Sequence, residues 1–257
     1  MGKIIAITNQ KGGVGKTTTA INLSAALAIL DKKVLLIDAD PQSNATAGLG
    51  IKQEDIKYTL YDVMSGIANV DDAILPTEVP NLDILPSTID LVGAEVELVN
   101  ESEREYVMKK SIGLAKKDYD YIFIDCLPSL GILTVNALVA ADSVIIPVQS
   151  EYYSLEGLGK LKDTIAAVKK SYNPDLEIEG ILITMYDKRL RLAQMVVDSV
   201  RDIVTDHIFD TIINRNSKVN EAPMVGKPVI LYDASAVGSK NYLNLAYEVL
   251  VLNNDNL

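Results

Sequence analysis

The chain contains a glycine- and lysine-rich stretch, Lys11-Gly12-Gly13-Val14-Gly15-Lys16-Thr17-Thr18, between an apolar run at residues 4–7 and a helical run at residues 19–30. A strand, a glycine-rich turn and a helix in this order are typical of a phosphate-binding loop. Glycines let backbone N–H groups converge on an anion, and the new helix adds its own unpaired N–H groups. The stretch therefore predicts a fold that opens with a buried strand followed directly by a helix.

Two side chains of this stretch have the chemistry of a nucleotide site. Lys16 can reach the β- and γ-phosphates, and the Thr17 hydroxyl can bind Mg²⁺. The alternative is a glycine-rich turn with two solvated lysines, Lys11 and Lys16. The spacing and the strand–helix context favour the nucleotide site, so we take every residue from Lys11 to Thr18 as a candidate ligand.

Apolar, β-branched runs alternate with helical patterns along the chain, which is typical of a buried parallel sheet. The strands are predicted at residues 3–8, 33–37, 82–85, 121–124, 143–148, 178–184 and 208–213. The helices are predicted at residues 17–30, 92–117, 131–140, 154–172, 190–205 and 235–251, with a short one at 58–64. We therefore expect an α/β fold of the P-loop NTPase type, with a doubly wound, mostly parallel sheet of about seven strands. We expect a single domain over residues 1–257.

Charge and cysteine content restrict the class of protein. The formal net charge is −11, from 24 Lys and Arg against 35 Asp and Glu, which argues against a surface coated with basic residues but allows a local basic patch. The single cysteine, Cys126, excludes an internal disulfide and fits a reducing compartment. The chain starts with the first strand, and no apolar run has transmembrane length, so we expect a cytoplasmic protein.

Three aspartates follow predicted strands. Asp38 and Asp40 follow the second strand, and Asp125 follows four apolar residues in a Walker B pattern. Ligands of open α/β sheets bind at the carboxyl ends of strands, so we expect these side chains beside the glycine-rich loop. Asp38 and Asp125 can bind the water shell of Mg²⁺, and Asp40 can orient the attacking water in phosphoryl transfer. The alternative for the first pair is an Asx/Pro turn that only closes the strand.

The loop differs from the ordinary G-x-x-x-x-G-K-[ST] motif, because Gln10 stands in place of the first glycine and Lys11 adds a second lysine. This K-G-G-x-G-K-T-T form is the deviant Walker A motif, and it resembles the ParA/MinD group of ATPases. The resemblance implies that Lys11 reaches the nucleotide of the other subunit in an ATP-dependent homodimer, acting in hydrolysis with Lys16. The D-x-D-P-Q segment resembles the family's first switch, which implies that Asp40 is needed for hydrolysis. The second switch, usually D-x-P-P-S, has Leu127 in place of its first proline.

The whole chain resembles the small ParA/Soj partition ATPases. It carries T-M-Y-D-x-R, R-N-x-x-x-x-E-A-P and G-K-P-V-I-x-Y-D in the matching order. The resemblance implies ATP and Mg²⁺ as cofactors, non-specific DNA as a ligand, and a ParB-type partner that stimulates a weak ATPase. It also implies that Asn216 borders the adenine and that Tyr152 and Tyr153 face the dimer.

Residues 186–240 contain eight Lys and Arg against seven Asp and Glu, so they do not share the strong negative charge of the rest of the chain. A few basic side chains give salt-sensitive, sequence-independent affinity for DNA. The DNA contacts that the resemblance implies are Arg189 and Lys218, with Arg215, Lys227 and Lys240 as further candidates. The composition of residues 186–240 alone fits an ordinary solvated surface as well as it fits a DNA-binding one.

These observations predict an ATP-dependent switch for chromosome or plasmid partition, associated with the nucleoid. The alternative is a MinD-like, membrane-associated positioning ATPase, which needs a basic amphipathic helix at its C-terminus. Residues 243–257 contain no Lys or Arg, so we expect no membrane partner. A metabolic ATPase or ligase is a third class, because the fold alone does not separate these functions.

Overall fold

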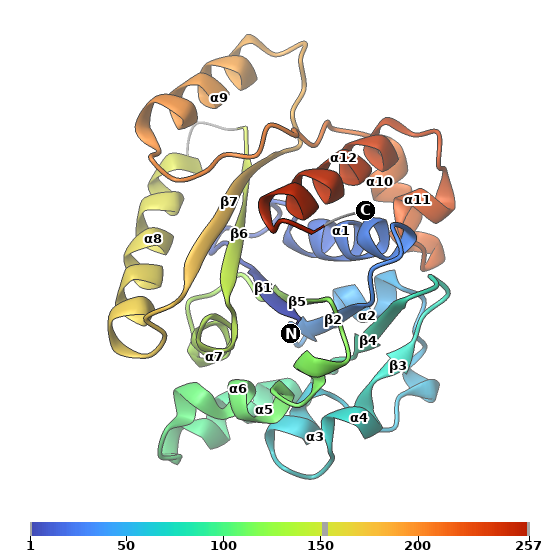
Figure 1. The fold of residues 1–257 in the computed structure, drawn as a ribbon, viewed down its shortest axis with the longest axis vertical. Coiled ribbons are helices and arrows are strands. Elements are labelled where there is room, and N and C mark those ends of the chain that lie inside the picture. The colour runs from blue at the N-terminus through green and yellow to red at the C-terminus, as the bar shows by residue number, and fades with distance from the viewer. Residues whose placement is uncertain (1, 151–153, 256–257) are drawn as a thin grey trace.

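The computed structural model describes residues 2–150 and 154–255. Its strands are β1 (Lys3–Ile7), β2 (Val34–Ala39), β3 (Leu75–Pro76), β4 (Leu82–Leu85), β5 (Tyr121–Cys126), β6 (Ser143–Gln149) and β7 (Glu177–Thr184). Within the described residues, these seven strands form one sheet in the order β3-β4-β2-β5-β1-β6-β7 (Figure 1). Neighbouring strands are parallel except for β3, which is antiparallel to β4. The predicted α/β fold with a mostly parallel sheet is confirmed.

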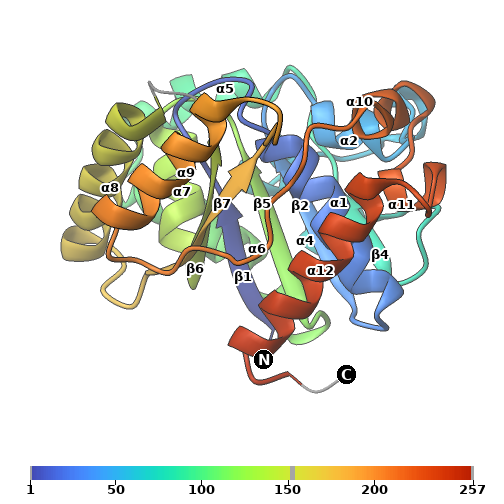
Figure 2. The same cartoon turned by 90° about the horizontal axis from the view of Figure 1, so that it is seen from above.

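Helices cover both faces of the sheet (Figures 1 and 2). They are α1 (Lys16–Ile29), α2 (Asn44–Gly48), α3 (Leu60–Met64), α4 (Val70–Ala73), α5 (Leu91–Glu97), α6 (Val107–Ile112), α7 (Ile132–Ala140), α8 (Ser154–Ser171), α9 (Arg191–Ile203), α10 (Ser217–Glu221), α11 (Val229–Tyr232) and α12 (Val237–Leu252). Along β1, Ile5 and Ile7 pack on the side of α1 and α12, whereas Ile4 and Ala6 pack on the side of α7. Burial on both faces explains why the strands read as continuous apolar runs. Among the described residues, no helix has both the length and the apolar character needed to cross a membrane.

The crossovers of the chain determine where a ligand can bind. The connection after β1 leads through α1 to β2, and the connection after β5 leads through α7 to β6 on the other side of β1. Connections that diverge in this way leave a crevice at the carboxyl ends of the strands. The ends of β1, β2 and β5, which carry the glycine-rich loop and the predicted aspartates, therefore meet at one edge of the sheet.

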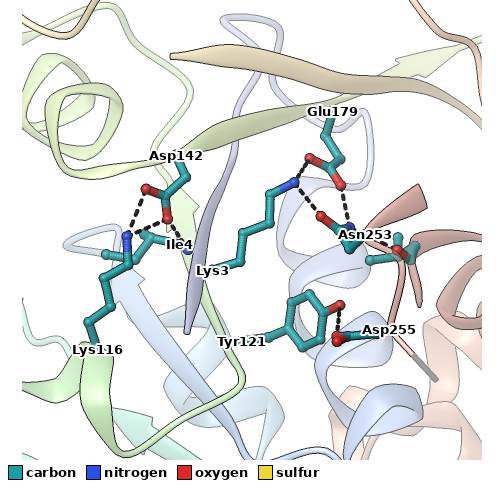
Figure 3. A network of polar contacts seen from close by, with 9 residues as sticks. Lys3, Ile4, Lys116, Tyr121, Asp142, Glu179, Asn253 and Asp255 are labelled. Atoms are coloured by element: carbon teal, nitrogen blue, oxygen red, sulfur yellow. Dashed lines mark hydrogen bonds and ion pairs between the residues drawn. The ribbon is translucent and has the colours of Figure 1, made fainter. Parts of the chain in front are cut away.

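The residues after α12 are attached to the opposite edge of the sheet (Figure 3). The Asn253 side chain accepts a hydrogen bond from the Lys3 ammonium group and donates one to the Glu179 carboxylate, and the Tyr121 hydroxyl donates to Asp255. Beside this network lies a hollow of about 610 Å³, lined by charged side chains of both signs. None of the predicted site residues lines it, so the predicted chemistry lies at the other edge.

The segment at residues 208–213, predicted as the last strand, is not one. It runs beside β7 but forms only isolated parallel bridges. The N–H groups of Asp210 and Thr211 donate to the carboxylate of Glu248 on α12 instead of extending a ladder with β7. The seventh strand is β3, a two-residue edge strand that ends in Pro76 and is too short to show a periodic pattern.

The helix predicted at residues 92–117 is interrupted. It consists of α5, α6 and 3₁₀ turns at Leu98–Asn100, Arg104–Tyr106 and Ala115–Lys117. Glu103 has a φ of +56°, a left-handed conformation that a right-handed helix does not contain. The Asn136 side chain holds the break, since it accepts from the Met108 N–H at 3.0 Å and donates to the Arg104 carbonyl at 2.8 Å. The other predicted helices agree with α1, α3, α7, α8, α9 and α12 to within two residues.

Two glycine-to-alanine substitutions test how α12 packs. A Cβ at Gly238 would lie 2.2 Å from Cγ2 of Val219 on α10, whereas a Cβ at Gly159 on α8 would meet nothing within 4 Å. We expect Gly238→Ala to lower the free energy of unfolding by about 1–3 kcal/mol through overpacking. We expect Gly159→Ala, the matched control, to raise it by about 0.5–1 kcal/mol through better helix propensity. Urea unfolding measures both values, and a stabilising Gly238→Ala would contradict the packing.

Candidate nucleotide site and basic groove

The glycine-rich loop joins the end of β1 to the start of α1. Gly13 and Gly15 have φ values of +73° and +88°, in the left-handed region that glycine adopts without strain. A Cβ at Gly12 or Gly13 would meet no atom within 4 Å, so the space beside the loop is open. The positive end of the α1 dipole and its unpaired N–H groups point toward this space. The loop therefore has the form of an anion cradle.

Side chains outside the loop hold it in place. The Gln10 amide donates to the Gly157 carbonyl of α8 at 2.8 Å. The Thr184 hydroxyl, at the end of β7, donates to the Val14 carbonyl at 2.8 Å. Gln10, which departs from the ordinary motif, thus connects the loop to α8, and the sequence motif alone does not indicate this contact.

Lys16 lies inside the loop with only 6% of its surface exposed. Its ammonium group donates to the Lys11 carbonyl at 3.3 Å. Burial lowers the pKa of Lys16, and the nearby charges of Asp125 and Asp40 partly oppose this effect. A bound phosphate would stabilise the charged form of this poorly solvated lysine. Lys11 is half-buried at the start of the loop.

Asp38 and Asp125 lie side by side, because β2 and β5 pair in a register that places them opposite each other. Both side chains are fully buried. Neither carboxylate oxygen of Asp125 makes a well-formed hydrogen bond, although the Thr17 hydroxyl lies near enough to favour the charged form. Burial, followed by the charge of Asp38, raises the pKa of Asp125 well above its ordinary value. A cation at this position would relieve the unfavourable energy of the pair.

The buried carboxylate of Asp38 has more hydrogen-bond partners than that of Asp125. Its carboxylate accepts hydrogen bonds from the Thr46 N–H at 2.8 Å, the Thr46 hydroxyl at 2.7 Å and the Asp40 N–H at 3.2 Å. Burial raises the pKa of Asp38 to about 6, and the bonds from Thr46 limit that rise. Asp40 is buried nearby, and its carboxylate accepts from the Gln42 N–H at 2.9 Å. No motif in the sequence marks Thr46.

The oxygen donors fit Mg²⁺ when phosphates and water complete the shell. Within residues 2–150 and 154–255, no three His, Cys, Asp or Glu side chains gather as a metal site of their own. Thr17, Asp38 and Asp125 provide oxygen atoms, and Mg²⁺ in nucleotide sites keeps several waters and takes phosphate oxygens. The unsatisfied, buried oxygens of Asp125 support this fit.

A cavity of about 180 Å³ adjoins the loop at the end of β7. Gly15 and Thr18 line one side, and Asn214 and Asn216 line the other. The residue after β7, Met185, also lines it and has a φ of +53°, which is unusual for a residue other than glycine. The structure therefore brings Asn216, predicted to border the adenine, next to the phosphate loop.

A groove of about 370 Å³ adjoins this cavity and contains three basic residues, Lys188, Arg189 and Arg215. Arg189 forms a two-pronged ion pair with Asp187, at 2.9 and 2.6 Å, which lowers the pKa of Asp187 to about 2. The groove and the cavity share Asn214, Arg215 and Asn216. Lys188 belongs to the basic region of the sequence, but no motif marks it as a contact.

The other predicted DNA contacts do not line the groove. Lys218 pairs with Glu221 at 2.8 Å, and Lys227 pairs with Glu78 at 3.1 Å. Lys240 is exposed on α12, one turn after Val237, which does line the groove. Of the predicted set, the structure brings together Arg189 and Arg215. Tyr152 and Tyr153, predicted to face a dimer, lie outside the described residues.

The sheet order and the loop between β1 and α1 place the chain among the P-loop nucleotide-binding proteins, and residues 2–178 match a family model described as an AAA domain. The chain is 55% identical to the sporulation initiation inhibitor protein Soj of Bacillus subtilis, over 97% of this chain and 98% of that protein. It is 51% identical to the chromosome partitioning protein ParA of Myxococcus xanthus, over 97% and 88% of the two chains. The chromosome-partitioning ATPase Soj of Treponema pallidum is 50% identical, over 97% and 98%. The chain belongs to the ParA/Soj family of partition ATPases, as its motifs predicted.

Solved structures agree with this fold. Cobyrinic acid a,c-diamide synthase from Mycobacterium smegmatis, with bound ADP and magnesium, matches with a TM-score of 0.85 and 34% identity, over 97% of this chain and 94% of that one. A putative plasmid partition protein from Borrelia burgdorferi, bound to AMPPNP, matches with a TM-score of 0.84 and 29% identity, over 98% and 99%. Both solved proteins hold an adenine nucleotide.

Asp125→Asn tests whether the buried charge lacks a partner. A carboxyl group whose pKa is raised from 3.8 by burial destabilises the folded protein increasingly as the pH rises above that value. We therefore expect Asp125→Asn to raise the Tm of the nucleotide-free protein by a few degrees at about pH 8, and by less at about pH 6. The variant should also lose the extra stabilisation that Mg²⁺ adds to ATP.

Differential scanning fluorimetry with and without ATP and Mg²⁺ measures both effects. The matched control is Asp175→Asn, an exposed aspartate near the end of α8 that should change neither. A lower Tm for Asp125→Asn at about pH 8 would mean that the charge already has a stabilising partner within the protein.

Proposed function

We propose that this chain is an ATP-dependent switch for DNA partition, acting as one domain over residues 1–257. The observation that carries the proposal is that the nucleotide cavity and the basic groove share Asn214, Arg215 and Asn216. A change of nucleotide therefore acts on residues that also line the groove. The names of the relatives, which include chromosome-partitioning proteins and a chromosome-partitioning ATPase, support the same function.

ATP binds at the glycine-rich loop, with backbone N–H groups and Lys16 around its phosphates. The Thr17 hydroxyl would hold Mg²⁺ directly, and Asp38 and Asp125 would hold it through water. The metal supplies charge neutralisation at the phosphate oxygens. Asp40 orients the attacking water, since phosphoryl transfer depends mainly on positioning and electrostatics. The ADP and magnesium named with one solved structure support these cofactors.

Two copies close over their nucleotides, and Lys11 of each reaches the phosphates bound by the other, while Asn216 borders the adenine. Dimerisation doubles the positive groove. DNA phosphates then replace carboxylates such as Asp187 as partners of the exposed basic side chains, because exposed ion pairs contribute little. A ParB-type partner stimulates the otherwise weak hydrolysis, and DNA is released. Affinity for DNA of any sequence implies association with the nucleoid.

The alternatives have less support. A membrane-associated positioning ATPase binds anionic lipid through a basic amphipathic helix, whereas α12 carries one lysine, Lys240, and no arginine. A metabolic role is represented by the diamide synthase, which shares the fold at 34% identity. The partition proteins are at least 50% identical in sequence to this chain over nearly its whole length, and this higher identity favours a role in partition over a metabolic one.

Lys188→Ala and Arg189→Ala test the groove without changing the nucleotide cavity, which neither residue lines. Each variant should bind random-sequence duplex DNA more weakly in the presence of a non-hydrolysable ATP analogue. The slope of log affinity against log salt should fall by about one for each DNA phosphate that the variant no longer neutralises. Lys169→Ala, at an exposed position on α8, is the matched control. If the control weakens DNA binding as much as the groove variants, the groove is not the DNA site.

Lys11→Ala and Lys16→Ala should separate nucleotide binding from dimer closure. Lys16→Ala should lose affinity for a fluorescent ATP analogue, because the buried cation beside the phosphates is gone. Lys11→Ala should keep that affinity but remain monomeric with the analogue in sedimentation velocity. A Lys11→Ala protein that dimerises like the wild type would refute the role of Lys11 across the interface.

A further inference from the structure

Thr46 lies in the first turn of α2, and its hydrogen bonds concentrate on one oxygen atom of Asp38. The Thr46 hydroxyl donates to Oδ2 of Asp38 at 2.7 Å, and the Thr46 N–H donates to the same atom at 2.8 Å. Thr46 is 3% exposed and Asp38 is fully buried. Two short hydrogen bonds to one charged oxygen, shielded from water, hold the carboxylate in a single orientation.

The neighbouring strand determines which way the Thr46 hydroxyl points. β4 lies beside β2, and the N–H of Ser87, just after β4, donates to Oγ1 of Thr46 at 3.1 Å. Because the hydroxyl oxygen accepts this hydrogen bond, the hydroxyl hydrogen is available for Asp38. A chain of hydrogen bonds therefore runs from the backbone of Ser87 through Thr46 to Asp38, and all three residues are buried.

Close packing fixes α2 against the helix that follows the glycine-rich loop (Figure 2). A Cβ at Gly48 would lie 2.5 Å from Cδ1 of Ile21 on α1. Ala45, the residue before Thr46, is buried in the core on the α1 side of the sheet. Since α1 also carries Thr17, the packing holds Thr46 at a fixed place relative to another predicted Mg²⁺ ligand.

The two carboxylate oxygens of Asp38 are therefore in different situations. Oδ2 is occupied by Thr46, whereas Oδ1 accepts a longer hydrogen bond, from the Asp40 N–H at 3.2 Å. Oδ1 thus keeps the capacity to accept a hydrogen bond from a water molecule of a bound Mg²⁺. Mg²⁺ requires nearly ideal octahedral geometry, so the oxygens that hold its water shell must be placed accurately. Mutation of a residue that orients such a carboxylate typically lowers metal affinity by roughly 10–100-fold.

We propose that Thr46 is a positioning residue of the magnesium site. Its hydroxyl and N–H hold Oδ2 of Asp38 and leave Oδ1 to the water shell of Mg²⁺. Thr46 acts through Asp38 and is not itself a ligand. Loss of its hydroxyl weakens the binding of Mg²⁺ with nucleotide and leaves nucleotide binding without metal unchanged. The inference rests on the proposed placement of Mg²⁺ at Thr17, Asp38 and Asp125, but it does not depend on the proposed role in DNA partition.

Thr46→Val removes the hydroxyl group and keeps the branched shape of the side chain. The measurement is the affinity for a fluorescent, non-hydrolysable ATP analogue, first with Mg²⁺ and then with EDTA. The ratio of the two affinities is the factor by which the metal tightens nucleotide binding. We expect Thr46→Val to reduce this factor by about tenfold or more and to leave the affinity in EDTA unchanged. Thr46→Ser, which keeps the hydroxyl, should restore the wild-type factor.

Thr77→Val is the matched control, because the Thr77 hydroxyl also donates a hydrogen bond, to the Leu82 carbonyl at 2.8 Å, but lies next to the edge strand β3. It should lower the Tm and leave the metal factor unchanged. A second probe is Mn²⁺ in place of Mg²⁺, whose free concentration in the presence of ADP is measured by electron paramagnetic resonance. Thr46→Val should bind Mn²⁺ more weakly than the wild type, whereas Thr77→Val should not. If thermal unfolding shows that Thr46→Val is not folded, Thr46→Ala takes its place in both measurements.

Two results would overturn the inference alone. An unchanged metal factor in Thr46→Val, together with a lower Tm, would mean that Thr46 serves only the packing of α2. An equal loss of affinity with Mg²⁺ and with EDTA would mean that the variant damages the whole nucleotide site. If the wild type itself binds the analogue equally well with Mg²⁺ and with EDTA, the placement of the metal in the proposed function fails as well.

Discussion

Two buried carboxylates, Asp38 and Asp125, are held next to each other by the register of β2 and β5, and the protein's own groups compensate their charges only in part. The buried Lys16 lies near enough to help, but burial lowers its own pKa. Binding of a nucleotide with a divalent cation would relieve both the burial of the charged lysine and the burial of the two charged aspartates. The phosphate favours the charged form of the lysine, and the metal favours the charged forms of the aspartates. The unfavourable electrostatic energy of these buried groups is therefore a source of affinity for the ligand.

The end of β7 connects this site to the groove. Thr184 holds the glycine-rich loop through the Val14 carbonyl, Met185 follows in a left-handed conformation, and Lys188 and Arg189 come next. A nucleotide that moves the glycine-rich loop would therefore also displace the end of β7, and the basic side chains follow only a few residues later in the chain. In the proposed function, coupling over so short a distance needs no rearrangement of the sheet, and ATP hydrolysis at the loop would release the ligand of the groove.

Sequence motifs predicted the parts of the site that share one stretch of chain or one edge of the sheet, because the phosphate loop and the strand-end aspartates follow from general rules of α/β proteins. Thr46 was missed because its role depends on a tertiary contact with Asp38. The break in the helix at residues 92–117 was missed because it depends on the distant Asn136. The resemblance implied that Lys218 and Lys227 contact DNA together with Arg189, yet each of the two lysines pairs with a carboxylate outside the groove, a tertiary arrangement that the motifs do not encode.

In the proposed function, the bound nucleotide controls the affinity of the groove for DNA. The most direct measurement is the affinity of the native chain for random-sequence duplex DNA at two salt concentrations, first with Mg²⁺ and a non-hydrolysable ATP analogue and then with Mg²⁺ and ADP. We expect at least about tenfold tighter binding and a steeper salt dependence with the ATP analogue, because two grooves then act together. Equal affinity and equal salt dependence in the two states would contradict the coupling between nucleotide and groove.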